Sequence, residues 1–526
     1  MLLGSSVMSA AQQYRIDYIQ GSLPWLSTDN PAALTTLNIP HVSEGRVGLT
    51  SENGGFHDFR QPQSALTLAA DVESYYRIMP RMVGYGRMAY QNSSLHHVAG
   101  SAFMDSQHMP FDIVEDSLTN EGNAHRDVYN IIGGLSYSLH PHLAIGAQLD
   151  FKAANYAKYK DLRHKNTLTD INVKAGLFIP TTFISIGANA YYRRTIEGVT
   201  FSIYGSEDKI YRSLIDYGIL TGEIETFGEQ GYTEKGEEHP LVSEQKGFSV
   251  QMGMATADSC LTWTNEFAYR SREGYYGRDS EYDIVYSRHD GNIYKASSIL
   301  ALHEHANIHQ LRFSLGIENL RNLASTYRTI QDTQTTAHYY EYYTPVKTAN
   351  KVWADYTIGY NGYLSVNGNV PRWQLSAAYG HSQREQTIYY YPYSRHQLLS
   401  ANTLSATVLR NISIHEGTLG IKGSLAYRWG NGDIYDDLTL ATPSDKQREP
   451  DTMTEYQLRD YHSFTAPQYT AGIALRYSHP FSPQPSACLE AYIEVSAAVS
   501  HVNGSAADSF TGNERRCFSI TLGSHF

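Results

Sequence analysis

Several groups of histidines in this sequence have the composition of a metal site. The chain holds 22 histidines, with His303, His305 and His309 around one expected turn and His140 and His142 around another. Two imidazoles separated by one residue can bind a transition metal, but a stable site needs further fixed ligands, which neither group supplies. We therefore expect solvated turns at both places and no bound metal.

Acidic residues are concentrated between residues 431 and 461, which makes calcium a second candidate ligand. The carboxylates of this stretch are Asp433, Asp436, Asp437, Asp445, Glu449, Asp451, Glu455 and Asp460. Their spacing does not follow the ligand pattern of a calcium-binding loop. A solvated acidic loop is the simpler interpretation.

Catalytic motifs are absent from the sequence. It contains no G-x-S-x-G, no H-E-x-x-H, no phosphate-binding loop and no dinucleotide fingerprint. The net charge of −12 argues against a nucleic-acid partner. We predict that the protein is not an enzyme and uses no cofactor. Scattered Ser, His and Asp residues leave a barrel enzyme open as a less favoured alternative.

The stretch that organises the chain is its last one, residues 516–526. Apolar Phe518, Ile520, Leu522 and Phe526 alternate with small or polar residues, which predicts a β-strand with one apolar face. An ordinary last strand of a soluble β protein would expose an apolar edge, whereas a closed barrel leaves no edge. A terminal phenylalanine behind such alternation resembles the assembly signal of bacterial outer-membrane barrels. By that resemblance, the barrel-assembly machinery binds it.

The same period of two recurs along most of the chain, for example at 143–152, 419–429 and 489–499. No stretch approaches the ~18 apolar residues of a transmembrane helix, and about ten residues per strand suit a tilted crossing of a bilayer. Short turns alternate with long polar connections, among them 154–165 and 385–398, as in outer-membrane barrels. We predict an all-β fold, a transmembrane antiparallel β-barrel of 14–18 strands in the bacterial outer membrane, with 18 the best count.

Tyrosine is unusually frequent, with 42 Tyr against 17 Phe and 5 Trp. Clusters such as Tyr389 to Tyr393 lie in expected outer loops. They suit adaptable contacts with proteins or sugars, or they form the girdle at the membrane interface and its extension on projecting strands. The sequence does not decide between these two interpretations.

The inner face of the predicted barrel is polar and carries charges of both signs. The residues expected to face the lumen include Asp150, Lys152, Lys174, Lys422, Arg428, Arg476, Glu490 and Glu494. Such a wall suits water, polar solutes or an inserted segment better than a continuous apolar path for lipids. Pairing among the wall's own charges explains the composition equally well.

The N-terminal region precedes the first strand and lacks alternation. Residues 1–11 look like the remnant of a secretory signal peptide, and residues 12–43 are too apolar for a free tail but too short for a domain with its own core. The run Asn30-Pro31-Ala32-Ala33-Leu34 resembles the N-terminal hatch of the long-chain fatty-acid transporter family. That resemblance implies a segment folded into the lumen as a plug, with Trp25, Asn30, Pro31 and Leu34 as its marker residues.

Taken together, the sequence predicts a plug-like segment at 12–43 and a barrel at 44–526. The whole chain resembles uncharacterised Bacteroidota-type outer-membrane barrels, and this resemblance implies passage or uptake of a small solute, with or without a co-encoded partner. The alternative is a barrel that does not transport and instead scaffolds a surface lipoprotein, a receptor or a secretion component. The expected partners are therefore outer-membrane lipids, the barrel-assembly machinery and a surface lipoprotein or receptor.

Overall fold

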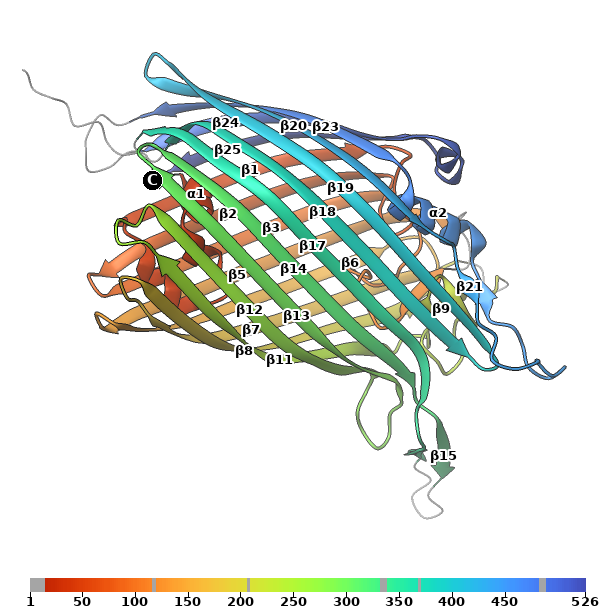
Figure 1. The fold of residues 1–526 in the computed structure, drawn as a ribbon. Helices are drawn as coiled ribbons and strands as arrows, with labels where there is room; N and C mark the ends of the chain where they lie inside the picture. The colour runs from red at the N-terminus through yellow and green to blue at the C-terminus, as the bar shows by residue number, and fades with distance from the viewer. Residues whose placement is uncertain (1–14, 116–119, 206–208, 332–337, 368–369, 482–488) are drawn as a thin grey trace, which may run out of the picture.

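The computed structural model describes residues 15–115, 120–205, 209–331, 338–367, 370–481 and 489–526. The predicted signal-peptide remnant, residues 1–11, lies outside the described residues. Figure 1 shows one large barrel of slanting strands, with a helical segment inside one end and several loops folded over the other end.

A single antiparallel sheet forms the wall of the barrel. It contains 19 strands, and apart from the two-residue β21 (Asp436–Asp437) all of them belong to the wall, so the wall has 18 strands. They are β1 (His41–Asn53), β2 (Ser64–Met79), β3 (Met82–Val98), β5 (Gly122–His140), β6 (Leu143–Lys158), β7 (Arg163–Ile179), β8 (Ile184–Ser202), β11 (Glu238–Ala255), β12 (Leu261–Gly277), β13 (Val285–Glu304), β14 (Asn307–Ala324), β17 (Val346–Asn367), β18 (Val370–Tyr390), β19 (Tyr393–Ile414), β20 (Gly417–Gly432), β23 (Gln468–Pro480), β24 (Glu490–Val502) and β25 (Glu514–His525). The predicted fold class and the preferred strand count are confirmed.

The barrel closes between its first and last strands. β1 pairs with β2 on one side and with β25 on the other, with Leu49 opposite Ile520 and Val47 opposite Leu522. Phe526 and Ser43 exchange two backbone hydrogen bonds of 3.0 Å at the end of this seam. Closure therefore leaves no unpaired edge in the wall.

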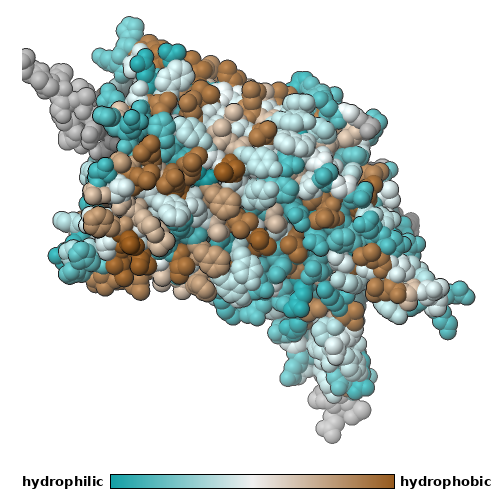
Figure 2. All heavy atoms as spheres, viewed as in Figure 1, coloured by the Kyte–Doolittle hydropathy of each residue, from teal (hydrophilic) through white to brown (hydrophobic). Residues whose placement is uncertain are grey.

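The outer face of the wall is apolar over the half nearest the short turns. Figure 2 shows hydrophobic side chains gathered over the strands and hydrophilic ones over the projecting loops. Phe518, Ile520, Leu522 and Phe526 all point outward, and each is at least 40% exposed. Of the spanning structures, only helices and closed barrels satisfy their backbone hydrogen bonds in lipid, and the described residues include no helix long and apolar enough to cross a membrane. The protein is an outer-membrane β-barrel.

Paired tyrosines mark the outer boundary of this apolar band. Rings on neighbouring strands lie 4.7–6.4 Å apart at their centroids, namely Tyr90 with Tyr129, Tyr269 with Tyr294, Tyr356 with Tyr379, and Tyr427 with Tyr469. Beyond them the outward residues become charged, for example Arg321, which pairs with Asp290. Tyrosine rings with wet hydroxyl groups are typical of the membrane interface, so much of the tyrosine content belongs to a girdle.

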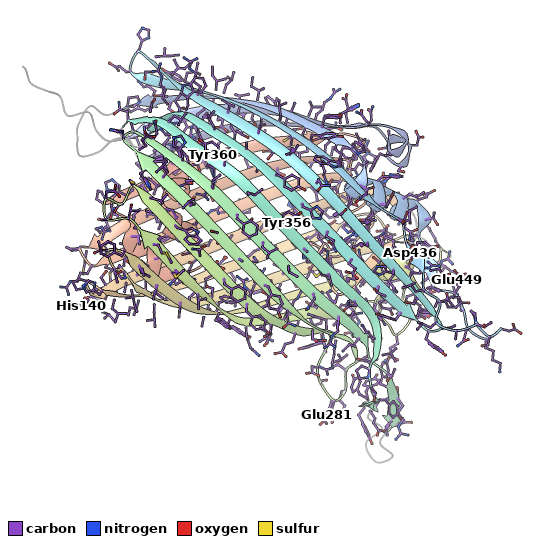
Figure 3. The ribbon with its side chains drawn as sticks, viewed as in Figure 1. His140, Glu281, Tyr356, Tyr360, Asp436 and Glu449 are labelled. Carbon is purple, nitrogen blue, oxygen red and sulfur yellow. The ribbon has the colours of Figure 1, made fainter. Side chains whose placement is uncertain are left out.

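Two connections predicted as long loops, 154–165 and 385–398, are tight turns. β6 continues to Lys158 before β7 begins at Arg163, and β18 continues to Tyr390 before β19 begins at Tyr393. The strands project beyond the membrane, where both faces are polar and the sequence loses its apolar alternation. Figure 3 shows the same asymmetry between the ends, with His140 at the short-turn end and Glu281, Asp436 and Glu449 on the opposite, projecting side.

Three long connections fold over the mouth of the barrel at the projecting end, and a fourth lies beneath them. Their described residues are 99–115 with 120–121, 203–205 with 209–237, 433–467, and 54–63, and we call them together the cap. Their regular elements are β4 (Asp112–Glu115), β9 (Arg212–Gly218), β10 (Thr221–Thr226), β22 (Asp451–Thr452) and α2 (Thr454–Thr465), of which the strands form a sheet in the order β22-β10-β9-β4. A hairpin of β15 (Tyr327–Gln331) and β16 (His338–Tyr342) projects farther out, and η4 (Ser505–Ser509) lies in the last connection.

The residues before β1 form three short helices within the opposite end of the barrel (Figure 1). They are α1 (Ile16–Ser22) and the 3-10 helices η1 (Pro24–Ser27) and η2 (Pro31–Thr36). We call residues 15–40 the N-terminal segment. β1 begins at His41, three residues before the predicted boundary, because the pairing with Tyr76 and Tyr75 of β2 already starts there.

The facing of the wall can be tested with neighbouring residues of β23. Ile473 is 56% exposed on the lipid side, whereas Ala474 occupies the next, inward position. Ile473→Arg is expected to lower the free energy of unfolding by about 2–4 kcal/mol, and Ala474→Arg by much less, measured by urea titration in lipid vesicles. Equal losses would show that this face of the sheet is not in lipid.

Candidate functional site

The N-terminal segment lies on a platform of inward-facing glycines, which we define as Gly146 of β6, Gly176 of β7 and Gly187 of β8. A Cβ atom at Gly146 would overlap the backbone of Ala32, and one at Gly176 or Gly187 would overlap the side chain of Asn30. Three neighbouring strands therefore carry no side chain where the segment approaches the wall most closely. This is the close-approach use of glycine.

Asn30 fixes the segment to this platform by hydrogen bonds. Its side-chain oxygen accepts from the Ala32 backbone N–H at 3.0 Å, which caps η2. Its amide nitrogen donates to the Leu177 carbonyl at 2.8 Å and to the Gln251 side chain at 3.0 Å. Pro31 follows at the first helical position, where a missing N–H has no consequence.

Ion pairs hold the neighbouring residue, Asp29. Its carboxylate accepts from the Lys174 ammonium at 2.8 Å and from the Arg270 guanidinium at 3.0 Å. The Asp29 backbone N–H donates to Glu266 at 3.1 Å. The segment thus contributes one carboxylate to a group of cations on β7 and β12.

The first half of the N-terminal segment reaches other parts of the wall. Arg15 lies 3.7 Å from Glu490 of β24, and Gln20 donates to Glu73 of β2 at 2.7 Å. Gln310 of β14 donates to the carbonyl of Ser22 at 3.3 Å. With the contacts to β7 and β12, the segment touches strands all around the barrel, so it crosses the lumen.

Apolar contacts complete the seat of the segment. The Trp25 ring packs on Phe178 with centroids 4.6 Å apart, and Leu34 lies against Gly134. Ile16 and Ile19 of α1 are buried in a cluster with Leu37, Val42, Tyr75 and Val83. All four residues marked by the sequence, Trp25, Asn30, Pro31 and Leu34, therefore lie at the wall of the lumen. That the segment blocks passage as a plug stays a prediction.

The cap and the wall share a hydrophobic core, because residues of the cap pack on Phe201 of β8, Leu241 of β11 and Tyr276 of β12. Phe111, Tyr232 and Tyr276 come from three separate parts of the chain, and their ring centroids lie 5.1–5.2 Å from one another. They belong to a larger buried cluster that includes Phe103, Ile113, Phe201, Ile215, Tyr217, Leu241 and Tyr286. The cap is therefore a packed structure over the mouth rather than a set of solvated loops.

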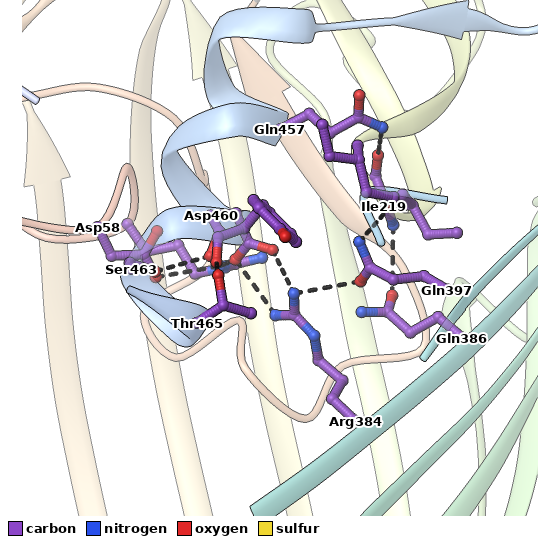
Figure 4. A network of polar contacts seen from close by, with 12 residues as sticks. Asp58, Ile219, Arg384, Gln386, Gln397, Gln457, Asp460, Ser463 and Thr465 are labelled. Atoms are coloured by element: carbon purple, nitrogen blue, oxygen red, sulfur yellow. Dashed lines mark hydrogen bonds and ion pairs between the residues drawn. The ribbon is translucent and has the colours of Figure 1, made fainter. Parts of the chain in front are cut away.

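One buried carboxylate ties the cap to the wall, as Figure 4 shows. Asp460 of α2 accepts from Arg384 of β18 at 2.5 Å and from Arg60 of the 54–63 connection at 2.6 Å. Burial acts to raise the pKa of the Asp460 carboxyl, but the two guanidinium groups outweigh it and hold that pKa well below its usual range. We call Arg60, Asp460 and Arg384 the latch.

Uncharged contacts reinforce the latch. Gln457 of α2 donates to the Ile219 carbonyl at 2.8 Å, and the Ile219 N–H donates to Gln386 of β18 at 3.3 Å (Figure 4). The prediction of a solvated acidic loop at 431–461 is therefore wrong for Asp460, which is buried. Asp436, Asp437 and Asp445 of the same stretch are exposed.

A polar cavity of about 470 Å³ lies beneath the cap, and we call it the chamber. Its lining combines wall residues such as Lys351, Trp353 and Arg428 with cap residues such as Asp112 and Asp216. Burial raises the pKa of the Asp112 carboxyl to about 7 and also raises the pKa of Asp216. Asp112 is therefore only partly charged at neutral pH.

A second cavity of about 360 Å³ lies between the N-terminal segment and the wall. Gln20, Trp25, Asn30, Gln148 and Lys174 line it. Both cavities are within the size range of small-molecule sites, and both are lined mainly by polar groups.

The lumen-facing residues expected from the sequence occupy inward positions of their strands but do not form one site. Lys174 and Glu490 hold the N-terminal segment, and Arg476 lies 3.5 Å from Glu44. Arg428 lines the chamber, and Asp150 accepts from Asn130 at 2.7 Å. The remaining three, Lys152, Lys422 and Glu494, lie on β6, β20 and β24.

Sequence reasoning missed the latch, the glycine platform and Asp29. Isolated inward glycines in strands are a known sign of close backbone approach, so Gly146, Gly176 and Gly187 were the available signal. No group of three or more metal-ligating side chains occurs within the ranges described above.

Comparison with known proteins gives one family match and several structural likenesses of low sequence identity. The model of the "Family of unknown function (DUF6850)" matches residues 31–526, and no curated protein matches the chain. The ferric preacinetobactin receptor BauA of Acinetobacter baumannii has 8% identity and a TM-score of 0.41, covering 92% of this chain and 80% of that one. The Escherichia coli outer membrane transporter YddB has 6% identity and a TM-score of 0.42, covering 93% and 81%.

A shorter structure, the TodX ΔS2S3 mutant monoaromatic hydrocarbon channel, has 10% identity and a TM-score of 0.31, covering 94% of this chain and 92% of that one. Likenesses at this level carry no argument about what this chain binds. Neither the family match nor these structures support the resemblance to Bacteroidota-type barrels or to long-chain fatty-acid transporters, which stays a prediction.

The glycine platform provides a direct test of the seat. Gly176→Leu would place a side chain where the Asn30 side chain now lies, so we expect the segment to leave the wall and the Trp25 indole to become accessible to acrylamide. Gly316→Leu is the matched control, because Gly316 also faces the lumen and has open space around it. Stern–Volmer quenching measures both variants, with Trp25→Phe used to assign the signal. Equal quenching of the two variants would contradict the seat.

Proposed function

The chain belongs to the DUF6850 family, and from its structure we propose that it is an outer-membrane passage for a small polar solute. The N-terminal segment closes it at the short-turn end, and the cap closes it at the projecting end. A solute passes when both have been displaced. The observation that carries this proposal is the polar chamber of about 470 Å³ enclosed between the cap and the wall.

The wall itself favours a polar passage. Across the barrel from the glycine platform, β19 to β25 present small polar side chains to the lumen: Thr403, Ser405, Thr407, Ser424, Ser496, Ser519 and Thr521. Ser496 and Ser519 bond with each other at 2.7 Å, and Ser424 donates to the Gly472 carbonyl at 3.5 Å. Small side chains leave room for a solute, and hydroxyl groups replace part of its hydration. Such a wall suits a polar solute better than a lipid.

Both closures are held by polar contacts beside apolar ones. The cap meets the wall through the latch and through the cluster in which Phe111 and Tyr232 pack on Tyr276 of β12. The segment is held by Asn30 and Asp29 and by the cluster of Ile16 and Ile19 with Tyr75 and Val83. Water, a solute or a partner can replace the polar contacts, and displacement must also separate the two apolar clusters.

A scaffold that does not transport is the competing function. The β15–β16 hairpin projects from the barrel (Figure 1) and exposes Tyr339, Tyr342 and the adjacent Tyr343. Tyrosine-rich projecting surfaces suit protein contacts. A surface lipoprotein or receptor bound there is compatible with passage, and it is the whole function only if the lumen never conducts.

Conductance in planar bilayers tests the passage. Deletion of residues 15–40, with the secretory start kept, removes one closure and is expected to raise the conductance above that of the parent. Adding Asp460→Ala, which removes the shared partner of Arg60 and Arg384, is expected to raise it further. Both effects follow because two barriers in series are being removed.

Deletion of the β15–β16 hairpin, residues 327–342, is the control, because that hairpin lies outside the lumen and its loss is expected to leave the conductance unchanged. Heat-modifiable migration on gels verifies that each variant is an inserted barrel. If the inserted double variant conducts no better than the parent, passage is rejected and the scaffold is favoured.

A further inference from the structure

The chamber brings together cations from separate parts of the wall. Lys351 of β17, Arg384 of β18 and Arg428 of β20 all line it. Arg60 of the cap lies on the opposite side, and Asp460 stands between Arg60 and Arg384. The question is how much of this positive charge the chain neutralises by itself.

Three of the five cations that line the chamber are paired with carboxylates: Arg60, Arg384 and Arg515, the last with Glu52 at 2.6 Å. Arg60 pairs with Asp460 at 2.6 Å and with Asp58 at 3.1 Å, and Arg384 pairs with Asp460 at 2.5 Å. Asp58 and Asp460 together supply two negative charges for these two guanidinium groups. Together with Asp58, the latch is therefore electrically balanced and requires no ligand.

Arg428 is not neutralised in this way. Within the described part of the chain, no carboxylate lies within 4.0 Å of its guanidinium group, which instead rests on the Phe464 ring with its carbon 4.9 Å from the centroid. Arg384 lies 5.1 Å from the centroid of the same ring. The Nε atom of Arg428 is buried and has no hydrogen-bond partner. Asp355 of β17 lines the same chamber and acts on Arg428 against the positive charge of Arg384, but it lies more than 4.0 Å away and forms no ion pair with Arg428.

Lys351 is the second cation without an ion pair among the described residues. Its side chain is 7% exposed, and its ammonium group donates to the backbone carbonyl of Met109 at 3.2 Å. The carboxylates of Asp112 and Asp216 line the same chamber, but neither lies within 4.0 Å of the Lys351 ammonium group. A buried cation without a direct ion pair is unfavourable.

We propose that the chamber binds a small solute bearing a carboxylate or phosphate group, with Arg428 as its main anchor and Lys351 as the second cation. The planar guanidinium group binds such oxyanions through two parallel hydrogen bonds. Phe464 already fixes its plane, and the rings of Phe464 and Trp353 supply flat apolar surface for the body of the solute. This inference names the solute class of the proposed passage and rests on it.

Isothermal titration calorimetry of the full purified chain tests the site, with citrate and inorganic phosphate as probes and glucose as the neutral comparison. The parent is expected to bind at least one of the two anions and not glucose. Arg428→Gln is expected to weaken that binding at least tenfold, and Lys351→Gln several-fold. Arg428→Lys keeps the positive charge but lacks the planar guanidinium group, so its affinity for the anion is expected to lie between those of the parent and Arg428→Gln.

Arg410→Gln is the matched control. Arg410 also stacks on an aromatic ring, with its guanidinium carbon 4.8 Å from the centroid of Trp373, but it lies on the outer face of β19. Its substitution is expected to leave the affinity for the anion unchanged. Heat-modifiable migration again confirms that each variant is folded.

The results separate this inference from the proposed passage. Citrate binding alone assigns a carboxylate site, and phosphate binding alone assigns a phosphate site. If neither anion binds the parent, the inference is overturned even if the barrel conducts. It is also overturned if the affinity of Arg428→Gln for the anion is within twofold of the parent's affinity. Anion binding that Arg428→Gln abolishes, in a barrel that conducts in no variant, keeps the site and rejects passage.

Discussion

The structure depends on one constraint, the pairing of every backbone polar group in a wall that faces lipid. An open edge in hydrocarbon would cost several kcal/mol for each unpaired group, so β1 must pair with β25 as well as with β2. Closing a sheet of this many strands makes a lumen that the wall's own side chains cannot fill. The interior must then hold water, additional chain or both. The N-terminal segment and the cap are the additional chain, and the chamber is part of the remaining space.

The N-terminal segment and the cap fill part of this interior, and a few specific contacts hold each of them in place. The segment approaches the wall where Gly146, Gly176 and Gly187 carry no side chain, and Asn30 and Asp29 supply directed contacts there. The cap shares an aromatic core with wall residues such as Tyr276 of β12, and the latch is a second contact between them. Because Asp58 and Asp460 neutralise Arg60 and Arg384, Arg428 and Lys351 are the cations of the chamber that form no ion pair among the described residues.

The wall could be predicted from the sequence, since a period of two is a local property that each strand carries by itself. Leu522 and Ile520 alternate with polar neighbours whether or not the partner strand is known. The sequence also marked Asn30 as a residue of the plug-like segment, but it did not indicate its hydrogen-bond partners, the Leu177 carbonyl and the Gln251 side chain. The cap could not be predicted, because Phe111 and Tyr232 meet Tyr276 of β12 only after two distant connections have folded over the wall. Asp460 was taken for a solvated carboxylate for the same reason: its partners, Arg60 and Arg384, are 400 and 76 residues away along the chain.

The lumen we propose is closed at both ends by folded parts of the chain itself. Hydrogen–deuterium exchange of the protein in lipid nanodiscs tests whether both parts are folded, through peptides that cover residues 16–37 and the cap residues 454–465. We expect amides in both regions to exchange far more slowly than in an unstructured peptide, though faster than those of the paired wall strands. Exchange of either region at the rate of an unstructured peptide would contradict closure by folded segments.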